Sequence, residues 1–273
     1  METKKQPKRE GKKSRGASAG IVIAVCFILS ALLYVFILGD PSNFVNNDPN
    51  NHPLPGNMMG NIHKGGYNVV IVITLLFTAL ALGVERLFAL AKCKGKGNLI
   101  NFVYDVKAEL KKGDINAAEA LCAKQKGSVA AIVDAGLKKY KEMEKMSGLS
   151  KEDKVKEIKE ELEEATALEL PIMQQNLPII AAITTLGTLF GLLGTVLGMI
   201  RSFGALAAEG AADAVALSAG ISEALVNTAL GIATSAVAII LYSYFTGKVD
   251  NMTYAIDEMG FALTQTYAET HNS

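Results

Sequence analysis

Two apolar stretches of this sequence carry hydroxyl, amide and carboxyl groups at helical spacing. In the first, small or polar side chains advance by alternating steps of four and three residues, which places them on one face of a helix: Thr184, Thr188, Gly191, Thr195, Gly198 and Ser202. The second stretch has a similar face, made of Gly220, Glu223, Asn227, Gly231 and Thr234, with Thr228 and Ser235 beside it. Aligned groups of this kind can line a polar cavity or pore, and a carboxyl group beside them can exchange protons.

Tight packing of the two helices is the competing interpretation of these faces. Glycines spaced four residues apart let helix backbones approach closely in a bilayer, and a threonine in a helix often bonds its hydroxyl to a carbonyl of the preceding turn. We assign helix packing to five glycines: Gly187, Gly191, Gly194, Gly198 and Gly231. We assign the lining of a proton pathway to five polar residues: Thr195, Thr228, Glu223, Thr188 and Asn227.

Glu223 favours the pore interpretation because a carboxylate about two turns into an apolar span is costly and usually functional. The alternative is a residue at the membrane interface, hydrated or paired with Arg201. No acid or base lies near the midplane of either stretch, so a proton path here needs a titrating group from a partner. Glu85 and Arg86 lie at the inner end of a different apolar stretch, and we interpret them as an interfacial ion pair rather than a relay.

The elements that position these residues are four apolar stretches long enough to span a bilayer. We predict transmembrane spans at residues 20–39, 67–91, 170–202 and 215–246. Charged residues are almost absent from the last two spans, and they crowd between Lys92 and Glu169 instead. The fold class predicted is an all-α membrane protein whose long transmembrane helices extend into the cytoplasm, with a helical cytoplasmic domain.

The distribution of basic residues predicts the orientation. The segment 1–19 is strongly basic and is expected in the cytoplasm, whereas the connection 40–66 has Lys64 as its single cation and is expected in the periplasm. The domain 92–169 then lies in the cytoplasm, the loop 203–214 in the periplasm, and the C-terminal helix 247–273 in the cytoplasm. We interpret the first span as an anchor, and a cleaved signal peptide is the alternative.

The cytoplasmic segments have helical periodicity with recognisable caps. Asp114 is predicted to cap one helix, and Ser150 with Asp153 resembles a capping box that opens another. The latter helix runs towards the third span, so we expect one long helix bent near Pro171 or Pro178. The tail after the fourth span repeats apolar residues at helical spacing and is expected to continue that helix inward.

Several other classes of chemistry are disfavoured. The three cysteines match no zinc or redox spacing and are expected to be unpaired thiols, and the three scattered histidines do not form a metal site. We therefore expect no metal and no cofactor. The formal net charge is zero, from 27 Lys+Arg and 27 Asp+Glu, so no global field attracts nucleic acid. No P-loop is present, because "GKGN" lacks the required spacing, and nothing indicates an enzyme.

Three blocks, in order, carry a resemblance to a known family. They are "KKGDINAAEALCAKQKGSVAAIVDAGL", "GLLGTVLGMIRSF" and "GISEALVNTALGIATSAVAIILYSYF". Together they closely resemble the MotA/TolQ/ExbB proton channel family, and its ExbB branch most of all, over roughly residue 67 to the C-terminus. By position, Thr195 and Thr228 correspond to the family's pore threonines and Glu223 to its conserved acid.

The resemblance implies a homopentamer in the bacterial inner membrane that surrounds helices of an ExbD-like partner. In the family the partner supplies the protonatable Asp, and proton flow drives movement passed through a TonB-like protein to outer-membrane transport. The sequence departs from the family in two ways. Residues 188–190 replace a frequent Ala-Pro, which puts a proline kink there in doubt, and the first span is additional to the usual three.

Other functions stay open at this stage. Within the family, the chain could be a TolQ-like envelope-maintenance subunit or a gliding motor subunit, while MotA itself fits less well. A secondary transporter is a rival from another class, but internal repeats and a broken midplane helix are not seen. A passive membrane scaffold would explain the glycines and leave Glu223 and the aligned hydroxyls unexplained.

Overall fold

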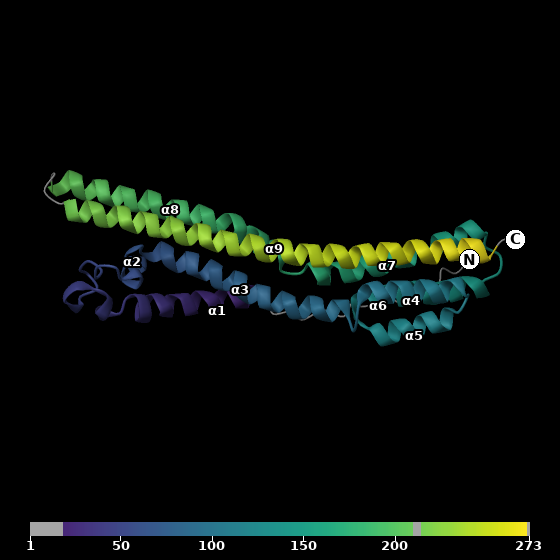
Figure 1. The fold of residues 1–273 in the computed structure, drawn as a ribbon. Helices are drawn as coiled ribbons and strands as arrows, with labels where there is room; N and C mark the ends of the chain where they lie inside the picture. Colours follow the sequence, from purple (N-terminus) through teal and green to yellow (C-terminus); the bar gives the residue numbers. More distant parts are fainter. Residues whose placement is uncertain (1–18, 210–213, 272–273) are drawn as a thin grey trace. The chain divides into compact units, whose positions relative to one another are not determined.

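The computed structural model describes residues 19–209 and 214–271, and over these residues the fold is all-helical (Figure 1). Four of the described helices are long and apolar enough to cross a membrane. The expected basic segment 1–19 lies almost entirely outside the described residues, and the expected loop 203–214 lies partly outside them. The chain divides into two compact units, which we call the apolar unit (Ala17–Arg86 and Asn176–Phe245) and the polar unit (Leu87–Gln175 and Thr246–Ser273).

The apolar unit begins with the additional N-terminal helix, α1 (Ala19–Leu32), which continues as the π-helical segment η1 (Leu33–Leu38). Two short 3-10 turns follow, η2 (Pro41–Asn43) and η3 (Val45–Asn47), and then the helix α2 (Met58–Lys64). The long helix α3 (Tyr67–Lys94) comes next. The unit is completed by α8 (Leu177–Glu209) and by the first part of α9 (Ala214–Thr270).

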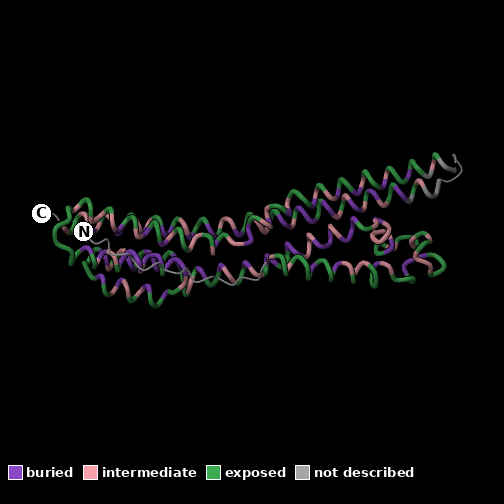
Figure 2. Tube along the Cα trace, turned by 180° about the vertical axis from the view of Figure 1, so that it is seen from behind, coloured by how far each residue is buried: buried purple, intermediate pink, exposed green. Residues whose placement is uncertain are grey.

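The helix α1 is attached to α3 by one buried polar contact and one apolar cluster. The hydroxyls of Ser30 and Thr74 lie 2.5 Å apart and are buried. At the end of η1, Leu38 packs with Val69 and Ile73 of α3. Most other residues along α1 are exposed and apolar, Phe27 among them, and Figure 2 draws this helix largely in the green of exposed residues. A helix with an apolar exposed surface and a single polar contact facing its neighbour is suited to lipid on its open side.

Helices α8 and α9 approach closely through glycine. A Cβ atom built on Gly231 would lie 2.5 Å from the carbonyl oxygen of Gly187 and 2.6 Å from the Cα of Gly191. Likewise, a Cβ on Gly198 would lie 2.9 Å from the Cβ of Ala224. Backbone therefore meets backbone along this contact, and side chains larger than hydrogen would force the helices apart.

The polar unit contains α4 (Leu99–Lys111), α5 (Ile115–Gln125), α6 (Gly127–Lys145), α7 (Lys151–Gln174) and the end of α9. Both predicted caps are confirmed, because the Asp114 side chain accepts from the Ala117 N–H and the Ser150 hydroxyl from the Asp153 N–H. The apolar faces predicted for α6 and for the tail of α9 are buried: Val129, Ile132, Val133, Leu137, Val249, Met252, Ile256 and Met259. The tail thus continues the fourth apolar helix without a break.

The expectation of one long helix bent near Pro171 or Pro178 is met in part, because the helical stretch is interrupted two residues before Pro178 and forms two helices there. Pro171 lies inside α7, and Pro178 is the second residue of α8, where a missing N–H is tolerated. The chain breaks between them, at Gln175 and Asn176, and Asn176 has the left-handed φ of 63°. Asparagine is among the few non-glycine residues that occupy this region readily, so the interruption falls on Asn176 rather than on either proline.

Candidate functional site

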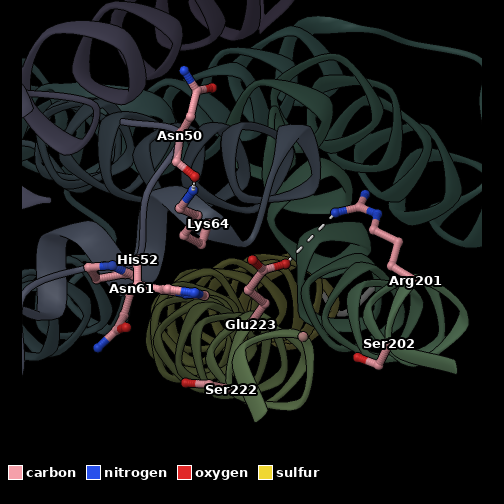
Figure 3. A pocket seen from close by; sticks show the side chains of 10 residues that line it. Asn50, His52, Asn61, Lys64, Arg201, Ser202, Ser222 and Glu223 are labelled. Atoms are coloured by element: carbon pink, nitrogen blue, oxygen red, sulfur yellow. Dashed lines mark hydrogen bonds and ion pairs between the residues drawn. The ribbon is translucent and has the colours of Figure 1, made fainter. Parts of the chain in front are cut away.

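A polar pocket of about 300 Å³ surrounds Glu223 in the apolar unit (Figure 3). Its walls come from α9, from the end of α8, from α2 and from the segment before α2: Asn50, His52, Pro53, Asn61, Lys64, Arg201, Ser202, Gly220, Ser222 and Glu223. The nearest approach between Arg201 Nη1 and Glu223 Oε2 is 3.9 Å, and the two side chains are 58% and 19% exposed. Pairing at this distance, with one partner open to solvent, is a weak attachment, so the Glu223 carboxylate keeps access to other groups.

Lys64 supplies the second cation of this pocket, and its position is fixed by backbone groups. Its Nζ donates to the carbonyl oxygens of Pro49 at 2.9 Å and Asn50 at 3.1 Å, and lies 5.5 Å from the centre of the Phe44 ring. These contacts hold the ammonium group at the pocket wall instead of leaving it free in solvent. The pocket therefore combines one carboxylate with two cations from separate elements.

The segment that carries Lys64 is held to the first helix by aromatic and polar contacts. The ring of His63 stacks on Tyr34 with centroids 4.4 Å apart and meets Phe44 edge to face at 5.5 Å. The Tyr34 hydroxyl donates to the His63 carbonyl at 2.9 Å, and Asn43 Nδ2 donates to the Ile37 carbonyl at 2.9 Å. Burial among these groups lowers the pKa of His63, so the ring favours its neutral form here.

Asn227 lies one turn beyond Glu223 and is almost fully buried, with 3% of its surface exposed. Its Nδ2 donates to the carbonyl of Gly65 at 3.0 Å, while its Oδ1 has no hydrogen-bond partner among the described residues. The neighbouring Asn68 donates to the carbonyl of Phe190 at 2.8 Å. Asn227 therefore ties α9 to the backbone just before α3, and its Oδ1 is a buried acceptor without a donor among the described residues.

Thr195 and Thr228 meet across the contact between α8 and α9. Their hydroxyls are hydrogen-bonded to each other, and both lie near the carbonyl of Gly191, at 3.4 Å and 3.2 Å. Both residues are half-buried. The sequence left open whether these hydroxyls bond backbone or line a path, and the geometry includes carbonyl contacts together with partial exposure.

The remaining sequence-selected residues lie along the same two helices or at the end of α3. The Thr188 hydroxyl donates to the Ser235 hydroxyl at 2.9 Å. Gly194 lies against Asn227, since a Cβ built there would be 2.5 Å from the Asn227 Cβ. Glu85 and Arg86 form an ion pair at 2.5 Å, and Asn176 donates to Glu85 at 3.1 Å.

Several residues of the pocket were not selected from the sequence. Asn50, His52, Asn61 and Lys64 lie in the connection after the first span, and only the count of cations drew attention to Lys64. That count gave no indication that this segment would meet residues more than one hundred positions later. All three cysteines are free, and no group of side chains able to hold a metal occurs among the described residues.

The fold and site define a multi-pass membrane protein in which polar side chains follow the contact between the apolar helices α8 and α9. We call this group the polar seam: Thr188, Thr195, Glu223, Asn227, Thr228 and Ser235. Residues 118–258, just over half of the chain, match the model of the MotA/TolQ/ExbB proton channel family. The chain belongs to this family, which is a family of proton channels and not of enzymes. The matched region contains Glu223, Thr195 and Thr228, while α1 and the segment carrying Lys64 precede it.

Three relatives illustrate the similarity. An ExbB-like biopolymer transport protein of Synechocystis sp. is 43% identical over 84 residues, which is 30% of this chain and 40% of that protein. An ExbB homologue of Methanothermobacter thermautotrophicus is 35% identical over 95 residues, 35% of this chain and 33% of that protein. The Tol-Pal system protein TolQ of Pseudomonas aeruginosa is 28% identical over 120 residues, 44% of this chain and 52% of that protein. The matches thus span between a third and about half of these relatives' lengths.

Proposed function

We propose that this chain is the proton-channel subunit of an ExbB–ExbD-type motor, which uses the proton-motive force to energise TonB-dependent outer-membrane transport. The observation that carries the proposal is the polar seam between α8 and α9. It combines Glu223 near one end with the hydrogen-bonded hydroxyls of Thr195 and Thr228 further along the two helices. The residues of the polar seam include no acid or base at the midplane. Such a seam can hydrate and guide a proton carrier, while the carrier itself must come from a partner.

The proposed partner is an ExbD-like subunit whose membrane-embedded Asp carries the proton. Its carboxyl group takes up a proton near Glu223, passes Thr195 and Thr228, and releases the proton on the other side. One proton crossing about 100 mV supplies roughly 2.3 kcal/mol, so a large conformational step needs several protons. In this proposal the helices rotate or shear against each other during the cycle, and the TonB-like protein transmits that movement.

The proposal includes the assembly and the orientation expected from the sequence. Five copies surround the partner helices in the bacterial inner membrane, with both termini in the cytoplasm. The connection 40–66 and the loop 203–214 then lie in the periplasm, which places the Glu223 pocket at the side from which protons enter. The domain 92–169 and the tail 247–273 lie in the cytoplasm, where Glu85 and Arg86 mark the inner interface.

A TolQ-like role in envelope maintenance is the second candidate. It is favoured by the match to TolQ, which extends over 120 residues and 44% of this chain, farther than either ExbB-like match described above. The two roles share the same conduction chemistry. They differ in the protein that receives the movement, so the seam does not distinguish them.

The testing experiment purifies the tagged chain in mild detergent, alone and co-expressed with its candidate ExbD-like partner, and measures masses by native mass spectrometry. A fivefold assembly retaining fewer copies of the partner is expected. The same complex is then reconstituted in liposomes to record proton flux under an imposed potential. A monomer or dimer that does not retain the partner, or a complex without flux, would refute the proposal and favour a transporter or scaffold.

A further inference from the structure

The inner end of α3 is clasped by the turn between α5 and α6, about thirty residues later in the chain. The Lys96 N–H donates to the carbonyl of Gln125 at 2.6 Å, and Gln125 Nε2 donates to the carbonyl of Lys94 at 3.0 Å. A Cβ built on Gly127 would lie 2.7 Å from the backbone nitrogen of Gly95. Both glycines have positive φ, so the clasp is a contact of backbone with backbone that admits no larger residue.

Lys126, in the middle of this turn, has a backbone conformation that is normally restricted to glycine. Its φ is 59° and its ψ is −178°. A side chain in this region is strained and persists where the surrounding structure imposes it, often at functional positions. A glycine at position 126 would remove the strain, and the chain carries a lysine there instead. The lysine side chain is therefore a candidate for the function of the turn.

The clasp concentrates positive charge. Five lysines belong to the two segments that form the clasp, around the end of α3 and around the α5–α6 turn, and all five are exposed: Lys92, Lys94, Lys96, Lys124 and Lys126. Within the described part of the chain, no carboxylate forms an ion pair with any of them, whereas several other lysines of the polar unit are paired, such as Lys139 with Glu157 at 3.0 Å. We call this group the lysine clasp.

The clasp is located at the level of the lipid headgroups by the continuity of α3. This helix runs unbroken from Tyr67 to Lys94, and its apolar sequence ends at Ala91. Lys92 and Lys94 follow the Glu85–Arg86 pair at the inner interface by about two turns of the same helix, a distance of about 10 Å, so their long side chains can reach the headgroups. Through the backbone contacts of the clasp, the α5–α6 turn is brought to the same level.

We propose that the lysine clasp is a binding site for anionic phospholipid headgroups, to which Lys124 and Lys126 of the α5–α6 turn contribute. The occupant is an anionic lipid because the site is a cluster of unpaired ammonium groups at headgroup depth. The interaction ties the helical domain to the membrane surface at a point other than the transmembrane helices themselves. This inference is independent of conduction and of the partner protein.

Amine labelling of the full-length protein in nanodiscs tests the site without any substitution. The protein is placed in nanodiscs of phosphatidylcholine, or of an equal mixture with phosphatidylglycerol, and labelled with a water-soluble amine reagent. Attraction of each lysine to an anionic membrane surface contributes roughly 1 kcal/mol of binding free energy, which corresponds to about a fivefold change in an association constant. We therefore expect labelling of Lys124 and Lys126 to slow about fivefold with phosphatidylglycerol, and the effect to vanish in about 1 M salt, where the Debye length is about 3 Å.

Lys111 and Lys145 are the matched controls, because both are exposed, belong to the same unit and form no ion pair among the described residues. Their labelling is expected to be the same in both lipids. Equal labelling of Lys124 and Lys126 in the two lipids would overturn the proposal. Slowing of the control lysines by the same factor would also overturn it, since the effect would then be a general one of the charged membrane.

A pair of variants provides the second readout. Lys124→Gln with Lys126→Gly removes two charges, and glycine at 126 is compatible with the backbone there. Lys111→Gln with Lys145→Gln removes two charges elsewhere. Native mass spectrometry with added phosphatidylglycerol and phosphatidylcholine gives the ratio of their association constants. We expect this ratio to fall by about thirtyfold in the first variant and to stay unchanged in the second. An unchanged ratio in the first variant would refute the site.

Discussion

Replacing Thr195 with valine separates a conducting hydroxyl from a packing one. Valine has nearly the same shape as threonine, so the contact between α8 and α9 keeps its volume while one hydroxyl is lost. The lost hydroxyl bonds to Thr228 and lies 3.4 Å from the Gly191 carbonyl. Thr228 keeps two carbonyl acceptors, Gly191 at 3.2 Å and Ala224 at 3.3 Å, so its own hydroxyl is not left unpaired.

These contacts set the size of the two expected effects. A hydrogen bond between transmembrane helices contributes about 0.6 kcal/mol on average and at most about 1.7 kcal/mol, so Thr195→Val should lower stability only slightly. A proton carrier that passes this level without the hydroxyl loses a partner for a buried polar group, at a cost of about 1–3 kcal/mol. That cost corresponds to a proton flux roughly 5-fold to 150-fold lower.

Thr74→Val is the matched control. The Thr74 hydroxyl also forms a buried contact between two helices of the apolar unit, at 2.5 Å from Ser30, but it lies on α3, away from the seam. Both variants and the unmodified chain are reconstituted with the ExbD-like partner in liposomes. Flux is recorded with an internal pH-sensitive dye under a potassium diffusion potential, and stability is measured by thermal unfolding in detergent.

The expected result is a similar small loss of stability in both variants and a loss of flux in Thr195→Val alone. If Thr195→Val conducts within twofold of the unmodified complex, the hydroxyl serves packing and the proposed path is wrong. Equal losses of flux in both variants would also refute the reasoning, because any weakened helix contact would then reduce conduction.

Three further predictions concern packing and titration. Gly231→Ala should destabilise the apolar unit by about 1–3 kcal/mol in thermal unfolding, because its Cβ would lie 2.6 Å from the Cα of Gly191, whereas Gly247→Ala, with no atom within 4 Å of the new Cβ, should be neutral or stabilising. Burial raises the pKa of the Cys122 thiol to about 12, so a maleimide should label it at neutral pH only after unfolding. As pH rises, the thiol loses its proton in the unfolded state before it does so in the folded state, so the free energy of unfolding should fall between about pH 9 and about pH 12. Burial lowers the pKa of His63, so as pH falls through about 6.5 the ring is protonated in the unfolded segment before it is protonated in the folded one, and the folded segment loses stability. Cleavage of residues 40–66 by an added protease should therefore increase at acidic pH, and His63→Phe should abolish that increase. Rapid labelling of folded Cys122, or cleavage independent of pH, would contradict these assignments.

The helices of the polar unit could be predicted from the sequence because their signals are local. Asp114 and Ser150 cap helices through contacts within three residues, and the buried face of α6 follows directly from apolar residues at helical spacing. The four apolar helices follow equally from their length and composition. An interruption near Pro178 was expected as a bend, but its form as a break at Asn176 did not follow, because both prolines lie inside helices while Asn176 takes the left-handed conformation.

The Glu223 pocket was only partly predictable. Glu223 stands out as a charge in an apolar span, and Arg201 as its nearest cation, because both signals are read along two neighbouring segments. Lys64 could not be assigned to the pocket in this way. Its position depends on the Pro49 and Asn50 carbonyls and on a fold of residues 39–66 that no helical or strand periodicity describes.

The origin of the pocket walls explains what the additional first helix contributes to the site. Glu223 and Arg201 belong to the region that matches the family, whereas Lys64 lies before it. Lys64 reaches the pocket because the backbone is held on either side of it, by Asn227 donating to Gly65 and by Tyr34 stacking on His63. Tyr34 belongs to the continuation of α1, and α1 is itself attached to α3. The additional helix thus holds in place a wall that adds a cation to the surroundings of Glu223.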